Sequence, residues 1–118
     1  MKVPEGLVKS SALTPTQVES LTTYLQVLSH EKTLKEAAET RSGGPVRIGS
    51  YYRTIHQGRR NIRSAVMTVV IATWMGFVKG DELKRLLEQA GRGLPDLQDK
   101  ETNRVAALIE ALVARIVM

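Results

Sequence analysis

The residues of this chain best suited to binding chemistry are arginines gathered in one stretch. Residues 49–65, GSYYRTIHQGRRNIRSA, hold four arginines, a histidine and two adjacent tyrosines, and no carboxylate. Six arginines give residues 41–63 a charge of +6: Arg41, Arg47, Arg53, Arg59, Arg60 and Arg63. The other 11 basic and 12 acidic residues leave −1 for the rest of the chain, and residues 40–80 contain no Asp or Glu. Such unbalanced positive charge is typical of a surface that binds a polyanion.

The residues required for catalysis or metal binding do not form a recognisable set. The chain has no cysteine, which excludes disulfides, thiolate zinc sites and cysteine nucleophiles. His30 and His56 have no partners at metal-ligand spacing, and the carboxylates form no close pair for acid–base chemistry. The SGGP sequence at residues 42–45 lacks the Gly-Lys-Ser/Thr of a phosphate-binding loop. We therefore expect no enzymatic activity, no metal and no cofactor.

The length and composition predict one compact domain, or one domain with an appended helix. The chain has 118 residues, of which 42% are hydrophobic. The longest apolar run, residues 65–78, is shorter than the roughly 20 residues that a membrane span needs. No apolar core of signal-peptide length follows the first lysines. We expect a cytoplasmic protein without membrane contact.

Helical periodicity and turn signals predict an all-α fold. Thr14, Pro15 and Gln17 have the spacing of a capping box that begins a helix, and Val18, Leu21, Leu25 and Leu28 form its apolar stripe. A second, short helix follows a Thr33 cap, turns Ala37 and Ala38 inward, and ends before RSGGP. Both alanines are small, so the next helix can cross close to this one.

A long third helix is expected from Ile48. At about 100° per residue, one continuous buried stripe is predicted, with these members: Tyr52, Ile55, Ile62, Val66, Val69 and Thr73. Arg53, Thr54, Gln57, Arg60 and Asn61 lie on the opposite, polar face. Beyond Ala65 the helix is apolar nearly all round, so it must be enclosed by other helices or by a second subunit.

The order of these elements predicts a helix-turn-helix at residues 14–65, after an N-terminal arm at 1–13 and before a helical packing and dimerisation region at 66–118. Arg53, Thr54 and Gln57 would lie on the first turns of the recognition helix and read bases. Phosphate contacts are expected from residues at or beside this helix: Arg47, Tyr51, His56, Arg59, Arg60 and Arg63.

Three motifs carry a resemblance to a known family. LTPTQVESLTTYL, TLKEAAET and VRIGSYYRTIHQGRRNIRSAV resemble the helix-turn-helix of region 4 of bacterial sigma factors and of related archaeal transcription regulators. The resemblance covers about residues 13–65. It implies that Ser50, Tyr51, Arg53, Thr54 and Gln57 lie at base-reading and phosphate-contacting positions, and it implies contact with the transcription machinery. The turn TRSGGPVRI is some three residues longer than the usual one.

These observations predict a sequence-specific protein for double-stranded DNA, acting as a homodimer in transcription regulation. A chromatin-type or RNA-binding protein that ignores sequence would use the same arginines on phosphates. A helical interaction module could instead hold an acidic protein on the basic face. The residues leave these alternatives open.

Overall fold

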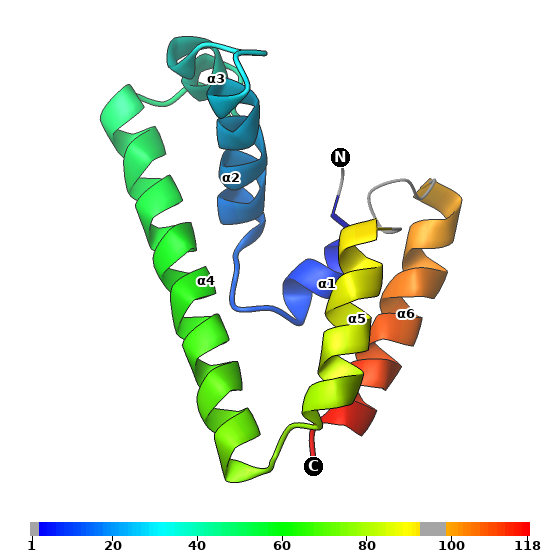
Figure 1. Cartoon of the computed structure of the whole chain (residues 1–118). Helices are drawn as coiled ribbons and strands as arrows, with labels where there is room; N and C mark the ends of the chain where they lie inside the picture. Colours follow the sequence, from blue (N-terminus) through cyan, green and yellow to red (C-terminus); the bar gives the residue numbers. More distant parts are fainter. Residues whose placement is uncertain (1–2, 93–98) are drawn as a thin grey trace. The chain divides into compact units, whose positions relative to one another are not determined.

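The computed structural model describes residues 3–92 and 99–118, and their regular structure is α-helical (Figure 1). The helices are α1 Glu5–Lys9, α2 Pro15–Leu28, α3 Leu34–Glu39, α4 Ile48–Met75, α5 Gly80–Arg92 and α6 Asp99–Ile116. The predicted all-α class is confirmed. The described residues divide into two compact units, Ser11–Arg63 and the pair of segments Met1–Ser10 and Ser64–Met118, so α4 contributes to both.

The capping box predicted for the first helix is present at the start of α2. Thr14 Oγ1 accepts a hydrogen bond from the Gln17 backbone N–H at 3.1 Å, and Gln17 Oε1 accepts one from the Thr14 N–H at 3.1 Å. Gln17 Oε1 also accepts a hydrogen bond from Asn61 Nδ2 of α4 at 3.1 Å. The cap therefore joins two helices, and Asn61 lies half-buried at their contact instead of on the expected polar face.

The core of the Ser11–Arg63 unit consists of Ala37, Ala38, Tyr51 and Ile55, each 1% exposed. The prediction that both alanines face inward is confirmed. The stripe expected on α2 is wrong in part, because Leu25 and Leu28 are more than half exposed. Leu21 packs on the core as expected, together with Tyr24 and Val27, which were not part of the predicted stripe. Gln17 and Ser20 are also buried on this helix. A hydrophobicity pattern does not predict the burial of polar side chains.

The buried face of α4 is turned by about 40° from the predicted one, at 100° per residue. Its buried members in this unit are Tyr51, Ile55 and Gly58, whereas Tyr52 and Ile62 are partly exposed. Gly58 determines this orientation because it lies against α2. A Cβ atom on Gly58 would be only 2.8 Å from Leu21 Cδ1. The expected continuous stripe through Tyr52, Ile62, Val66 and Val69 is therefore wrong for the chain by itself.

Two helices end in the same hydrogen-bond pattern, in which a residue with positive φ follows the last turn. At the end of α2, His30 has φ of 63°, and Glu31 N–H donates to the Gln26 carbonyl at 2.9 Å. At the end of α4, Gly76 has φ of 87°, and Phe77 N–H donates to the Ala72 carbonyl at 2.9 Å. Glycine adopts this backbone without steric penalty, and histidine does not.

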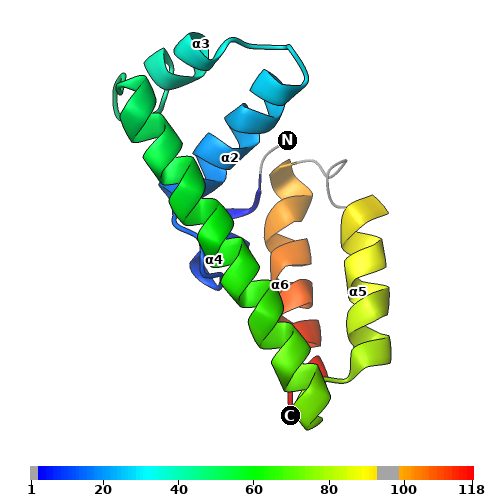
Figure 2. The ribbon, with the colours of Figure 1, turned by 60° about the vertical axis from the view of Figure 1, so that its left-hand side comes forward.

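The second unit contains α1, the C-terminal half of α4, α5 and α6. Helices α5 and α6 lie side by side in both views (Figures 1 and 2). Two backbone hydrogen bonds attach the C-terminus to the α4–α5 connection: Lys79 N–H to the Ile116 carbonyl at 3.0 Å and Met118 N–H to the Phe77 carbonyl at 2.9 Å. Helix α1 packs on α6, where Val8 and Ala106 are buried.

Candidate nucleic-acid interface

Tyr51 belongs to the core, and the prediction that it contacts phosphate is corrected. Its hydroxyl donates to the Ser20 carbonyl of α2 at 3.0 Å and also forms a short hydrogen bond with the Thr23 hydroxyl. Burial raises the pKa of the Tyr51 phenol above 10.0, and the Thr23 hydrogen bond opposes this effect. With its side chain enclosed and its hydroxyl bonded internally, Tyr51 fixes the N-terminal half of α4 against α2.

The orientation set by Tyr51, Ile55 and Gly58 determines which side chains α4 exposes. Arg53 and Arg60 lie opposite the buried face, and His56 and Gln57 flank them; all four are exposed. Thr54 lies nearer the core, is half-buried, and donates its hydroxyl hydrogen to the Ser50 carbonyl at 3.2 Å.

The predicted base-reading residues therefore do not all lie in the middle of the exposed face of α4. Arg53 and Gln57 are accessible on the exposed face of α4, whereas Thr54 lies at its edge. Ser50 is exposed in the first turn of the helix, and Arg47 is exposed just before it. The predicted phosphate-binding residues Arg59 and Arg63 are also exposed, on the side of the face that carries His56.

The positive charge of this face is not neutralised within the described residues. Their ion pairs are Lys9 with Glu5 and Lys35 with Glu39, each within a single helix and each at 3.9 Å. The arginines of α4 form no ion pair with any described carboxylate. We refer to Arg53, His56, Gln57, Arg60 and Arg63 as the basic face; its cations are free for an external anion.

An aromatic row that includes His56 of the basic face was not predicted. The rings of Tyr52 and His56 are stacked, with centroids 6.2 Å apart, and Tyr24 of α2 meets Tyr52 edge-on at 6.3 Å. The signal in the sequence is the spacing of four between Tyr52 and His56, which places two flat side chains on one helix face. Tyr52 and His56 are both exposed, on the side of α4 that also carries Arg59 and Arg63.

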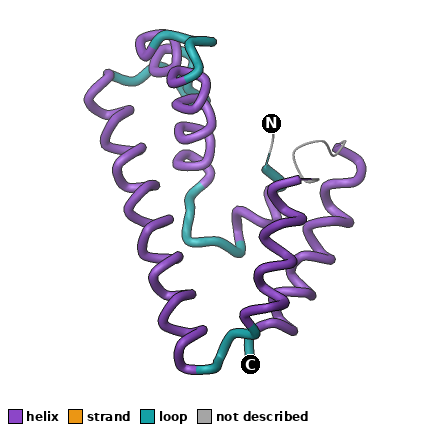
Figure 3. The backbone as a smooth tube through the Cα atoms, in the orientation of Figure 1, coloured by secondary structure: helices purple, strands orange, loops and turns teal. Residues whose placement is uncertain are grey.

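The long turn between α3 and α4, a loop in Figure 3, is attached to α3 and to α2. Val46 N–H donates to the Ala38 carbonyl at 3.0 Å, and Ser42 N–H donates to Glu19 Oε1 of α2 at 2.8 Å. Gly43 and Gly44 have φ of 87° and 120°, which explains why glycines occur here. The additional residues therefore form a loop that leaves Arg47 directly in front of α4.

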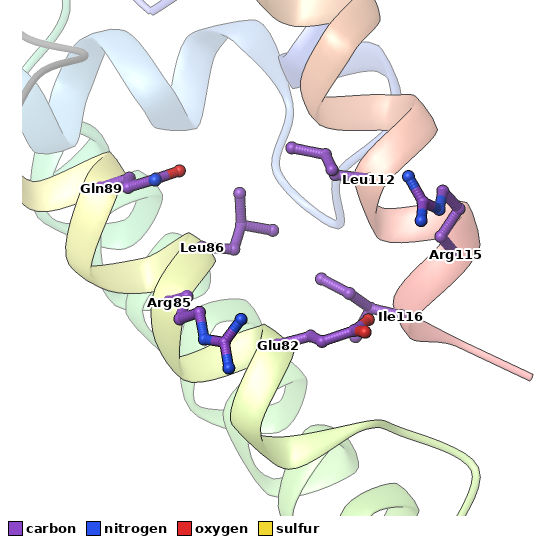
Figure 4. Close-up of a pocket in the computed structure, with 7 residues that line it drawn as sticks. All are labelled: Glu82, Arg85, Leu86, Gln89, Leu112, Arg115 and Ile116. Atoms are coloured by element: carbon purple, nitrogen blue, oxygen red, sulfur yellow. The ribbon is translucent and has the colours of Figure 1, made fainter.

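A cavity of about 250 Å³ between α5 and α6 is a weaker candidate for a ligand site (Figure 4). Leu86, Leu112 and Ile116 point into it, and charged side chains such as Glu82 and Arg115 lie at its edge. Its lining is mixed, with three apolar side chains and four charged or polar ones. Among residues 3–92 and 99–118 there is no cluster of His, Cys, Asp or Glu able to hold a metal ion. No helix in the same ranges has the length and apolar character needed to cross a membrane.

Comparison of the chain with protein-family models, curated proteins and solved structures finds no match. The structure therefore defines an all-α protein with an unneutralised basic helix face. The basic face of α4 is the feature of the structure that best indicates a function.

Proposed function

We propose that the chain binds double-stranded DNA through the N-terminal half of α4, acting as a dimeric transcription regulator. In this proposal α3, the following turn and α4 form the helix-turn-helix, and α4 enters the major groove. The observation that carries the proposal is the basic face. Its arginines have no carboxylate partner among the described residues, and they project from a helix whose opposite side is fixed by Tyr51 and Gly58.

The order of residues along the basic face supports two kinds of contact. Arg53 and Gln57 occur in the first turns of α4, and each can make a bidentate contact, to guanine and adenine respectively. Arg60 and Arg63 occur further along and fit the sugar-phosphate backbone. Arg47 precedes the helix, where a backbone phosphate passes in a groove-bound arrangement. Thr54 contributes less, because its hydroxyl is already bonded to Ser50.

The test begins with selection of bound duplexes from a random pool, followed by filter binding to the selected sequence at several salt concentrations. Arg53→Ala should weaken specific binding by about 1 to 3 kcal/mol and relax the preference at one base pair. Arg60→Ala should weaken binding to all duplexes and reduce the salt slope by about 1. Arg85→Ala, an exposed arginine on α5, is the matched control and should leave affinity unchanged.

Competition with random duplex distinguishes specific binding from the sequence-indifferent alternative. A specific complex survives excess random duplex, whereas a chromatin-type complex is displaced. If neither Arg53→Ala nor Arg60→Ala changes DNA affinity, the proposal is wrong. Binding of an acidic protein to the basic face then becomes the better explanation for its charge.

A further inference from the structure

The C-terminal half of α4 and the facing side of α5 form an apolar groove of about 670 Å³ within one unit of the structure. We call it the α4–α5 groove. Val66, Val69, Val70 and Thr73 line one wall at helical spacing, and Leu83 and Leu87 line the other. Its charged lining residues are Lys84 and Glu88. Neither forms an ion pair with any residue that the structure describes.

The exposed apolar surface of residues 66–77 and Leu87, taken over all sides of α4, is larger than an isolated chain usually leaves uncovered. Exposed large side chains follow one another from Val66 to Phe77, and Trp74 is 89% exposed. With about 200 Å² for each large side chain, they and Leu87 present on the order of 1,000 Å² of surface. The largest patch on a typical monomer is about 300 to 600 Å². A stable dimer buries about 800 Å² on each partner, so this area is sufficient for one when the partner covers the Met67 and Trp74 side of α4 as well as the groove side.

The pattern on α4 indicates several neighbours for this segment. Val66, Val69, Val70 and Thr73 face the groove, while Met67, Ile71 and Met75 lie on a different side of the same helix. A helix that is apolar on several sides is stable in water when it is enclosed. Helix α5 lies on the groove side, where Val66 and Val70 are still more than half exposed, so every apolar side of this segment requires a further partner.

The charges at the groove favour a second copy over an unrelated partner. A two-fold interface must be complementary to itself, because the same patch occurs on both subunits. A groove edged by one sign of charge would repel its copy. The α4–α5 groove instead carries one cation and one anion, Lys84 and Glu88, four residues apart on α5.

We propose that two copies of the chain pair through the α4–α5 groove, each placing the C-terminal half of its α4 along the groove of the other. The interface then consists of four helices, α4 and α5 from each copy. Lys84 of one copy pairs with Glu88 of the other. The proposal specifies the pairing surface and does not depend on DNA binding.

Sedimentation equilibrium of the full chain over a wide concentration range tests the proposal. The wild type should form a dimer. Val70→Glu should raise the dimer dissociation constant by about 100-fold or more, because it buries an unpaired charge. Val70 is exposed in the single chain, so helicity by circular dichroism should be retained. Leu108→Glu, an equally exposed leucine on α6, is the matched control and should change the constant little.

A charge exchange gives a second, independent readout. Lys84→Glu or Glu88→Lys alone should weaken the dimer by on the order of tenfold, because like charges then face each other. The double variant should restore it. A wild type that stays monomeric at every concentration overturns the proposal. The proposal is also overturned if Leu108→Glu raises the dimer dissociation constant as much as Val70→Glu does. It is overturned as well if the double charge variant dimerises as weakly as either single variant. Arg60→Ala should leave pairing intact, so failure of DNA binding and failure of pairing can be distinguished.

Discussion

Replacing Gly58 by alanine tests the close contact of α2 and α4. Alanine in a helix interior is favoured over glycine by about 0.5 to 1 kcal/mol. At Gly58, however, the new methyl group would lie 2.8 Å from Leu21 Cδ1 and 3.3 Å from Leu21 Cγ. Overpacking of this kind destabilises by about 1 to 3 kcal/mol. The net expectation for Gly58→Ala is therefore a loss of about 1 kcal/mol in the free energy of unfolding.

Gly49→Ala in the same helix is the matched control. A Cβ atom on Gly49 meets nothing within 4 Å, so only the gain in helix propensity of up to about 1 kcal/mol remains. The two variants should differ by about 2 kcal/mol. Urea unfolding followed by circular dichroism at one protein concentration measures this difference.

A double variant separates the steric effect from every other effect of the new methyl group. Leu21→Ala removes the two atoms that a Cβ on Gly58 would strike. In that background Gly58→Ala should become stabilising, which gives a coupling energy of about 1 to 3 kcal/mol. If Gly58→Ala stabilises the wild type as much as Gly49→Ala does, the proposed close contact and the orientation of α4 derived from it are refuted.

Three further changes test single features of the Ser11–Arg63 unit. Burial raises the pKa of the Tyr51 phenol in the folded chain. As pH rises above about 10, the phenol therefore loses its proton in the unfolded chain before it does so in the folded chain. The stability that Tyr51 contributes is present below that pH and falls as pH rises further. The stability advantage of the wild type over Tyr51→Phe in urea titrations should therefore shrink above pH of about 10; a constant difference would contradict the assignment. His30→Gly should raise the free energy of unfolding by about 1 kcal/mol, because φ at this residue is 63°, and a loss of stability there would contradict the backbone geometry. The buried Ser20 hydroxyl has no hydrogen-bond partner among the described atoms, so Ser20→Ala should leave thermal stability unchanged or raise it; a loss above about 1 kcal/mol would show that the hydroxyl is bonded.

Features that depend on neighbouring residues in the chain could be predicted from the sequence. The Thr14 and Thr33 caps both accept the hydrogen bond expected of them, and α3 ends before the two glycines. The basic face was likewise recognisable, because the absence of acids from residues 40–80 is a property of the sequence itself.

The orientation of α4 could not be predicted in the same way, because a contact between helices determines it. Tyr51 and Tyr52 are adjacent and identical in type, and at 100° per residue they lie equally far on either side of Ile48 and Ile55, so the helical spacing does not distinguish them. The contact that turns Tyr51 inward is made at Gly58, whose missing side chain gives no hydrophobic signal. An error of about 40° moved one tyrosine between core and surface and placed Thr54 too centrally on the basic face.

Trp74 gives the chain a built-in optical reporter. It is the single tryptophan of the sequence, and 89% of it is exposed in the isolated chain. Its fluorescence in a lone chain should therefore resemble that of tryptophan in water and be quenched readily by acrylamide. When a second copy covers this segment, the emission should move to shorter wavelength and become shielded. Dilution of the unlabelled protein then reports the separation of two copies without any probe being attached.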